Sequence, residues 1–125
     1  MSDSILTSTK KILGIEESYT AFDLDILTHI NSVFSTLNQL GVGPAEGFRV
    51  EDAGDVWDDF LDGDPRYNSV KTYVYLRVRL LFDPPTTSYH TTALKEEVLQ
   101  LEWRINAQRE STDYVDPDPV VVDDL

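Results

Sequence analysis

The segment FDLDILTHINSVFSTLNQLG, residues 22–41, decides the fold class of this chain. At 100° per residue its apolar side chains fall within about 140° of one helix face, and Leu24 alone lies on the far side. This one-sided pattern predicts an amphipathic α-helix that ends at Gly41. Thr20 and Asp23 resemble a capping arrangement at the start of this helix, although Asp is shorter than the usual Glu or Gln.

The same periodicity extends on both sides of this segment. It predicts a short first helix over residues 3–13, one or two helical turns over 56–61, a long helix over about 66–82 and a last helix over about 89–110. The Asp-Pro-Pro sequence at 83–85 ends the third of these abruptly, because proline lacks a backbone donor and restricts the residue before it.

These segments predict a mainly α fold, a small bundle of about four helices with an extended acidic C-terminal tail. The helical domain covers residues 1–110 and the tail covers residues 111–125. A chain of 125 residues is long enough for one ordinary hydrophobic core. The tail holds two Asp-Pro dipeptides and then Val120 to Val122, which favour an extended arm that pairs with another subunit or stays disordered in the free protein.

The helix over 66–82 differs from the others because apolar residues occupy almost its whole circumference. Such a helix is either central in the fold or covered by another chain, which makes Tyr73 and Leu80 candidate subunit contacts. Arg77 lies inside the apolar arc and is a third candidate. A buried arginine needs a carboxylate partner, which the acidic segment just upstream can supply, unless the side chain reaches solvent.

The last helix carries two apolar stripes. Leu99 and Trp103 lie roughly opposite its core-facing stripe, and a chain of this size has little left to cover them. They are therefore candidates for contact with a neighbouring subunit, with packing of Trp103 against the chain's own loops as the alternative. The expected core stripe is formed by Leu94, Val98, Leu101 and Ile105.

Charge is unevenly distributed along the chain, whose formal net charge is −13. Residues 51–64 contain seven acids and no base, the tail contains five acids and no base, and the remainder is nearly neutral. These two blocks disfavour nonspecific binding to DNA or anionic membranes, unless they are only solvated loops. The candidate channel-facing or partner-facing acids are Glu51, Asp52, Asp55, Asp58, Asp59, Asp62 and Asp64.

No residue pattern indicates catalysis or metal binding. The chain has no cysteine, and its two histidines, His29 and His90, stand in no ligand spacing. The acidic segment fails the EF-hand pattern, since counting from Asp58 puts Phe60 and Ser69 at ligand positions. Nucleotide-binding and hydrolase motifs are missing, and no segment is apolar enough to span a membrane. We therefore expect a protein without enzymatic activity or cofactor, soluble and made in the cytoplasm.

Four segments of the chain resemble one protein family. They are KKILGIEE at 10–17, HINSVFSTLNQLGVGP at 29–44, VWDDFL at 56–61 and VKTYVYLRVRLLFDPP at 70–85. In this order and spacing they resemble the head-tail connector proteins, also called adaptor proteins, of tailed bacteriophages and prophages. The resemblance covers roughly residues 3 to 110 and does not include the tail.

This resemblance implies a virion structural protein that forms a ring beneath the portal. Such a ring extends the DNA channel and offers a docking platform for a stopper or tail protein. The implied partners are the portal protein, the next connector or tail component and further copies of the chain, while DNA passes without specific binding and no membrane is involved. Carboxylates of residues 51–64 would then line the channel or meet an adjoining ring, because they repel phosphate.

Two other functions compete with this interpretation. An acidic inhibitor of a host nucleic-acid enzyme could imitate DNA, but imitation requires acids spaced along one face, whereas the body of this chain is nearly neutral. A small regulatory or metal-dependent enzyme would need a nucleophile or ligand constellation, which the sequence lacks.

Overall fold

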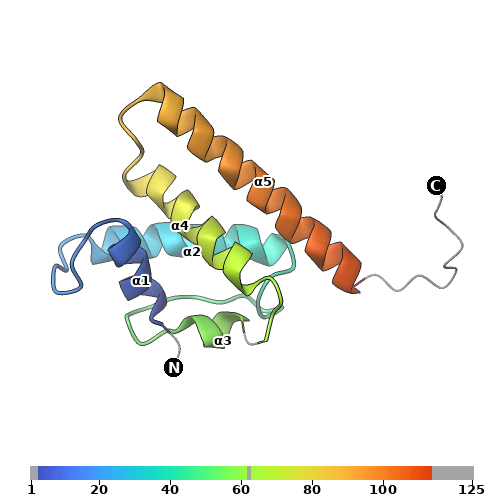
Figure 1. Cartoon of the computed structure of the whole chain (residues 1–125). Helices are drawn as coiled ribbons and strands as arrows, with labels where there is room; N and C mark the ends of the chain where they lie inside the picture. Colours follow the sequence, from blue (N-terminus) through green and yellow to red (C-terminus); the bar gives the residue numbers. More distant parts are fainter. Residues whose placement is uncertain (1–2, 62, 114–125) are drawn as a thin grey trace, which may run out of the picture.

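The computed structural model describes residues 3–61 and 63–113 and is mainly α-helical, as predicted (Figure 1). In these residues the backbone forms no β-strand, only one isolated bridge between Ser4 and Val56. The predicted tail from residue 114 onward lies outside the described residues. The helices are α1 (Ile5–Ile12), α2 (Asp23–Gln39), α3 (Trp57–Leu61), α4 (Tyr67–Phe82) and α5 (Ser88–Asp113).

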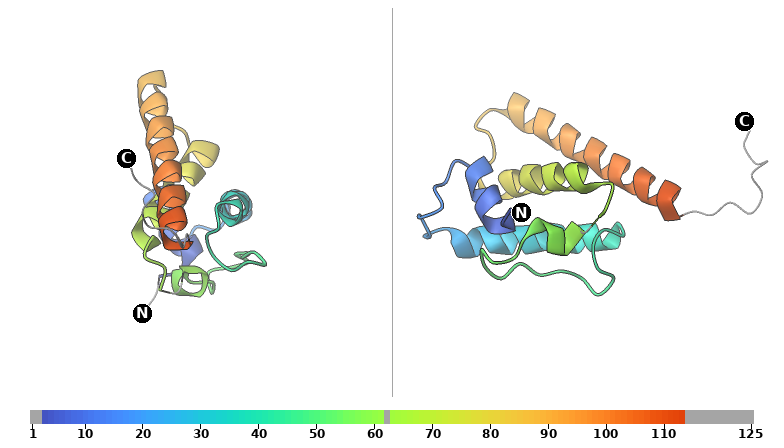
Figure 2. Two further views of the ribbon diagram at one scale, coloured as in Figure 1. Left: turned by 90° about the vertical axis from the view of Figure 1, so that its right-hand side faces the viewer. Right: turned by 60° about the horizontal axis from the view of Figure 1, so that its bottom comes forward.

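Helix α4 is the centre of the fold. It packs against both α2 and α5, and α1 contacts α2 and α4. Figure 2 shows α4 between α5 on one side and α2 on the other. This position explains why α4 is apolar around nearly its whole circumference: it is central in its own chain, the first of the two situations that the sequence allowed.

The core forms where the predicted face of α2 meets its neighbours. Leu24 is 76% exposed on the opposite side, as the periodicity predicts. The ring of Phe34 stacks on Phe60 of α3 with centroids 4.2 Å apart and lies 6.2 Å from the ring of Trp57. The buried residues of α2 are Ile26, Ile30, Val33, Phe34 and Leu37.

The start of α2 is held by an ion pair rather than by a side-chain cap. Residue Phe22 occupies the N-cap without a capping hydrogen bond, so the predicted Thr20 cap is wrong. Instead, the buried Lys10 ammonium lies 2.8 Å from Asp23 Oδ1 and donates to the carbonyl oxygens of Glu17 and Tyr19. One buried cation thus fixes α1, the α1–α2 loop and the first turn of α2, where a carboxylate also suits the helix dipole.

The long α2–α3 connection is anchored by side chains instead of a strand. Asn31 of α2 donates to the carbonyl oxygen of Val50 at 2.9 Å and accepts from its backbone nitrogen at 2.8 Å. Gly43 has a φ of +84°, and a Cβ there would lie 2.3 Å from the ring of Phe60. Glycine is therefore required at this position, both for its backbone conformation and for the close approach of α3.

Candidate assembly surfaces

A polar network joins α4 to α5 beside the core. The Tyr73 hydroxyl donates to Glu102 Oε2 at 2.6 Å, and Arg77 Nη1 donates to both Glu102 Oε2 and the Tyr73 oxygen at 3.0 Å. Burial raises the pKa of Tyr73, and the hydrogen bond to Glu102 raises it further. Tyr73 therefore remains neutral and bridges the ion pair between the two helices.

This network corrects the predicted partner of Arg77. The carboxylate that pairs with Arg77 belongs to Glu102 of α5, not to the acidic segment upstream of α4. Tyr73, a candidate subunit contact from the sequence, is fully buried in the isolated chain, with its hydroxyl bound to Glu102 of α5. The sequence carried one signal for Glu102: it follows Val98 by four residues, so the helical periodicity places it beside the core stripe of α5.

Helix α5 places its two apolar stripes as predicted, except that Leu94 of the expected core stripe is only half-buried. Its inner stripe is buried, with Val98, Leu101 and Ile105 all at most 5% exposed. On the outer face Leu99 is 62% exposed and Trp103 is 74% exposed, so Trp103 does not pack against the chain's own described loops. We call the outer face formed by Leu99 and Trp103 the α5 stripe. Leu80, the remaining apolar candidate, is half-buried against the core.

Unpaired cations flank the α5 stripe. Lys95 precedes Leu99 by four residues and Arg104 follows Trp103, and both side chains are exposed. Neither forms an ion pair with any residue that the structure describes. Leu99, Gln100, Trp103 and Arg104 together line a shallow hollow. This combination of apolar area and free positive charge is unusual in a chain of net charge −13.

The described carboxylates of residues 51–64 are of two kinds: some accept hydrogen bonds that hold the backbone, and others are exposed on the surface. Asp55 is half-buried, and its Oδ2 accepts from the backbone nitrogens of Glu51 at 2.8 Å and Asp52 at 3.4 Å, which closes the loop before α3. Asp62 lies outside the described residues. The side chains that project from the surface are those of Glu51, Asp52, Asp58 and Asp59. Four of the seven predicted acids are therefore exposed around α3.

Asp64 is bound to the start of α4. Its Oδ1 accepts from the backbone nitrogen and Nε of Arg66, and its Oδ2 lies 2.9 Å from Arg66 Nη2. Burial alone would raise the pKa of Asp64, but the hydrogen bonds from Arg66 outweigh it and hold the pKa below its usual value. Arg66 Nη2 also donates to the Gly41 carbonyl oxygen, so this pair ties the end of α2 to α4.

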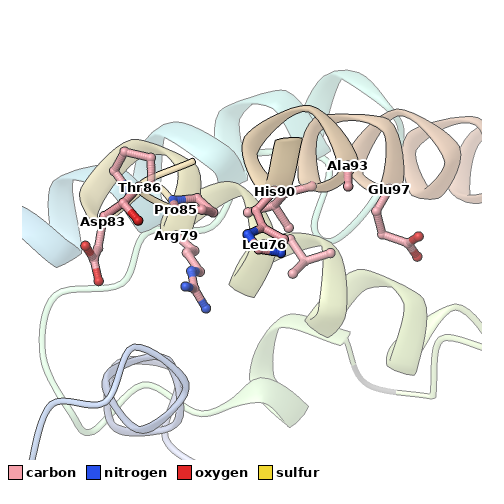
Figure 3. Close-up of a pocket in the computed structure, with 10 residues that line it drawn as sticks. Leu76, Arg79, Asp83, Pro85, Thr86, His90, Ala93 and Glu97 are labelled. Atoms are coloured by element: carbon pink, nitrogen blue, oxygen red, sulfur yellow. The ribbon is translucent and has the colours of Figure 1, made fainter. Parts of the chain in front are cut away.

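A pocket of about 650 Å³ lies at the turn between α4 and α5 (Figure 3). Its two carboxylates, Asp83 and Glu97, lie at opposite ends of the pocket. His90 is held by Thr87, whose Oγ1 lies 2.8 Å from His90 Nδ1. Thr87 Oγ1 also accepts from the backbone nitrogen of His90 at 3.3 Å, so this contact holds the first turn of α5.

Two further features concern metal ions and membranes. Across residues 3–61 and 63–113 no group of three or more His, Asp or Glu side chains is placed to hold a metal ion. Among the helices that the structure describes, none is long and apolar enough to cross a membrane.

The geometry describes a helical subunit whose longest helix leaves an apolar, cation-flanked face uncovered. A family model described as phage connector protein matches residues 5–112, and the chain therefore belongs to the phage connector protein family. The match spans α1 to α5 almost completely, as the resemblance of the four sequence segments indicated. Comparison with curated proteins and with solved structures gave no match.

Proposed function

We propose that this chain is a structural head-tail connector of the virion, without enzymatic activity. Identical subunits form a ring beneath the portal, extend the DNA channel and offer a docking platform for a stopper or tail protein. The observation that carries this proposal is the α5 stripe of a chain in the connector family. An exposed apolar face of this kind is typical of a protein–protein contact.

The arrangement of charge supports the same role. The exposed carboxylates Glu51, Asp52, Asp58 and Asp59 lie around α3, on the side of the molecule away from α5 (Figure 1). A surface of this sign repels phosphate at the channel wall or at an adjoining ring, so DNA slides past without binding. In the ring we place the α5 stripe between subunits and the α3 side towards the channel or the next ring.

A DNA-imitating inhibitor of a host enzyme fits the structure less well. Imitation requires carboxylates along an extended face, whereas two of the acids around α3 are occupied internally, Asp55 in the loop and Asp64 with Arg66.

Quantitative mass spectrometry of purified particles tests the proposal. The amount of this chain is compared with that of the portal protein in virions or induced prophage particles. We expect a nearly one-to-one ratio. Absence from particles together with abundance in infected cells would contradict the connector role and favour the inhibitor.

A further inference from the structure

A second exposed apolar surface lies at the end of the molecule where α2 begins and α4 ends. The Tyr19 and Phe22 rings are 5.7 Å apart, Phe22 and Phe82 are 5.4 Å apart, and His29 lies 6.3 Å from Phe82. Tyr19 is 51% exposed and Phe22 is 41% exposed. We call these four side chains the aromatic corner. It joins the α1–α2 loop, α2 and α4.

The aromatic corner is surrounded mainly by carboxylates. Glu16 forms a turn with Tyr19, Asp25 shares the face of α2 that carries Phe22 and His29, and Asp83 follows Phe82. With Glu17 these are four exposed acids, and none forms an ion pair within the described part of the chain. Two exposed cations, Lys11 and Arg79, lie nearby, so the surroundings keep a net negative charge.

The α5 stripe has the opposite sign. Among the described side chains, its exposed charged neighbours are the cations Lys95 and Arg104 and the acid Glu96. The two surfaces are therefore complementary, since both have exposed apolar side chains at their centre and the described charges around them have net values of opposite sign.

The two surfaces also lie apart on the subunit. The α1–α2 loop, the start of α2 and the end of α4 gather at one end, and the C-terminal half of α5 extends towards the other (Figures 1 and 2). A subunit can therefore use both surfaces at the same time, one for each neighbour.

We propose that the α5 stripe of one copy packs onto the aromatic corner of the next copy. This inference rests on the proposed connector function and specifies how its ring is built. A contact between two different surfaces repeats head to tail and closes into a ring when the rotation permits. The alternative, a two-fold contact of the α5 stripe with itself, would bring four cations together against two copies of Glu96 and is disfavoured by charge.

Cysteine cross-linking tests this contact directly because the chain contains no cysteine of its own. Particles are assembled with the double variant Tyr19→Cys/Leu99→Cys and treated with a short bismaleimide. A head-to-tail contact joins each copy to two neighbours, so denaturing gels are expected to show a ladder of covalent multimers. Either single variant is expected to give monomers only.

The matched control is Leu24→Cys/Leu99→Cys, since Leu24 is as exposed as the other positions but lies on the face of α2 away from the core-facing side. This control is expected to give no ladder. Far-UV circular dichroism of each purified variant verifies that the helical fold is kept.

Three results would overturn the inference while leaving the connector role intact, provided that the variant is found in particles. They are dimers formed by Leu99→Cys alone, a cross-link from Leu99→Cys to a different particle protein, and the absence of any ladder from the double variant. Absence of the wild-type chain from particles would instead contradict the proposed function, and the inference with it.

Discussion

The two tryptophans mark two regions of opposite character. Trp57 lies in the most acidic segment of the chain, yet it is fully buried, with its indole nitrogen donating to Ser8 Oγ at 3.0 Å. Its ring contacts the rings of Phe34, Phe60 and Tyr75. Trp103 lies in the middle of the longest helix and is 74% exposed.

This difference shows that the fold buries one tryptophan and leaves the other exposed, so the exposure of Trp103 is a property of the outer face of α5. A helix of five residues, α3, buries all three of its large apolar side chains although two of its five residues are Asp. Helix α5 buries one stripe and leaves the other uncovered. The chain is thus able to bury a tryptophan in an acidic segment, and this contrast supports the proposal that the surface around Trp103 meets another molecule.

The largest expected difference is in the free energy of unfolding, between alanine at Trp57 and alanine at Trp103. Because Trp57 is fully buried, Trp57→Ala leaves a cavity and should lower the free energy of unfolding by about 3 to 5 kcal/mol. Trp103→Ala should change it by less than about 0.5 kcal/mol, since an exposed side chain loses little packing. Urea unfolding followed by far-UV circular dichroism measures both, and similar losses at the two sites would contradict the contrast.

The inner and outer faces of α5 differ in the same way. Glu102→Ala leaves Arg77 and the Tyr73 hydroxyl without their acceptor and should cost about 1 to 3 kcal/mol of stability. Glu96→Ala, on the exposed face, is the control and should be neutral within about 0.5 kcal/mol. Equal stability of the two variants in urea unfolding would mean that the network does not hold α5 to α4.

The smallest expected effect concerns pH and the Asp64–Arg66 pair. The folded state lowers the pKa of Asp64, so the pair contributes stability at pH values above the ordinary aspartate pKa, and this contribution is lost as the pH falls through the folded pKa. Asp64→Asn should therefore be less stable than wild type at pH 7, and the difference should narrow as the pH approaches 3.

Glu51→Gln serves as the matched control for this pH series. Its carboxylate also lies two residues from an arginine, but the pair is exposed and its atoms are 3.9 Å apart. Such surface pairs contribute little, so this variant should follow wild type at every pH. A difference in unfolding free energy between Asp64→Asn and wild type that stays constant with pH would contradict a stabilising role for the ionised Asp64 carboxylate.

The sequence predicted what depends on local periodicity. The one-sided pattern of residues 22–41 placed α2 and left Leu24 outside, and the spacing in α5 separated the buried Leu101 from the exposed Leu99. Both results follow from 3.6 residues per turn, which each segment carries within itself.

What the sequence missed depends on which helices meet. The partner of Arg77 is 25 residues away, and only the packing of α5 on α4 selects Glu102 over the nearer acids. The same packing buries Tyr73. The aromatic corner draws Phe22 and Phe82 together from distant segments, and Lys10 reaches the first turn of α2 across a loop. The periodicity within one helix does not show which side chains of other elements lie opposite it.

Hydroxyl-radical footprinting of wild-type protein, free and in purified particles, tests most directly whether the α5 stripe is an assembly surface. Trp57 is the internal reference, because it is fully buried and should be oxidised slowly in both samples. We predict that Trp103 is oxidised rapidly in the free subunit and is protected several-fold in the particle. Equal oxidation of Trp103 in the two samples would contradict the account.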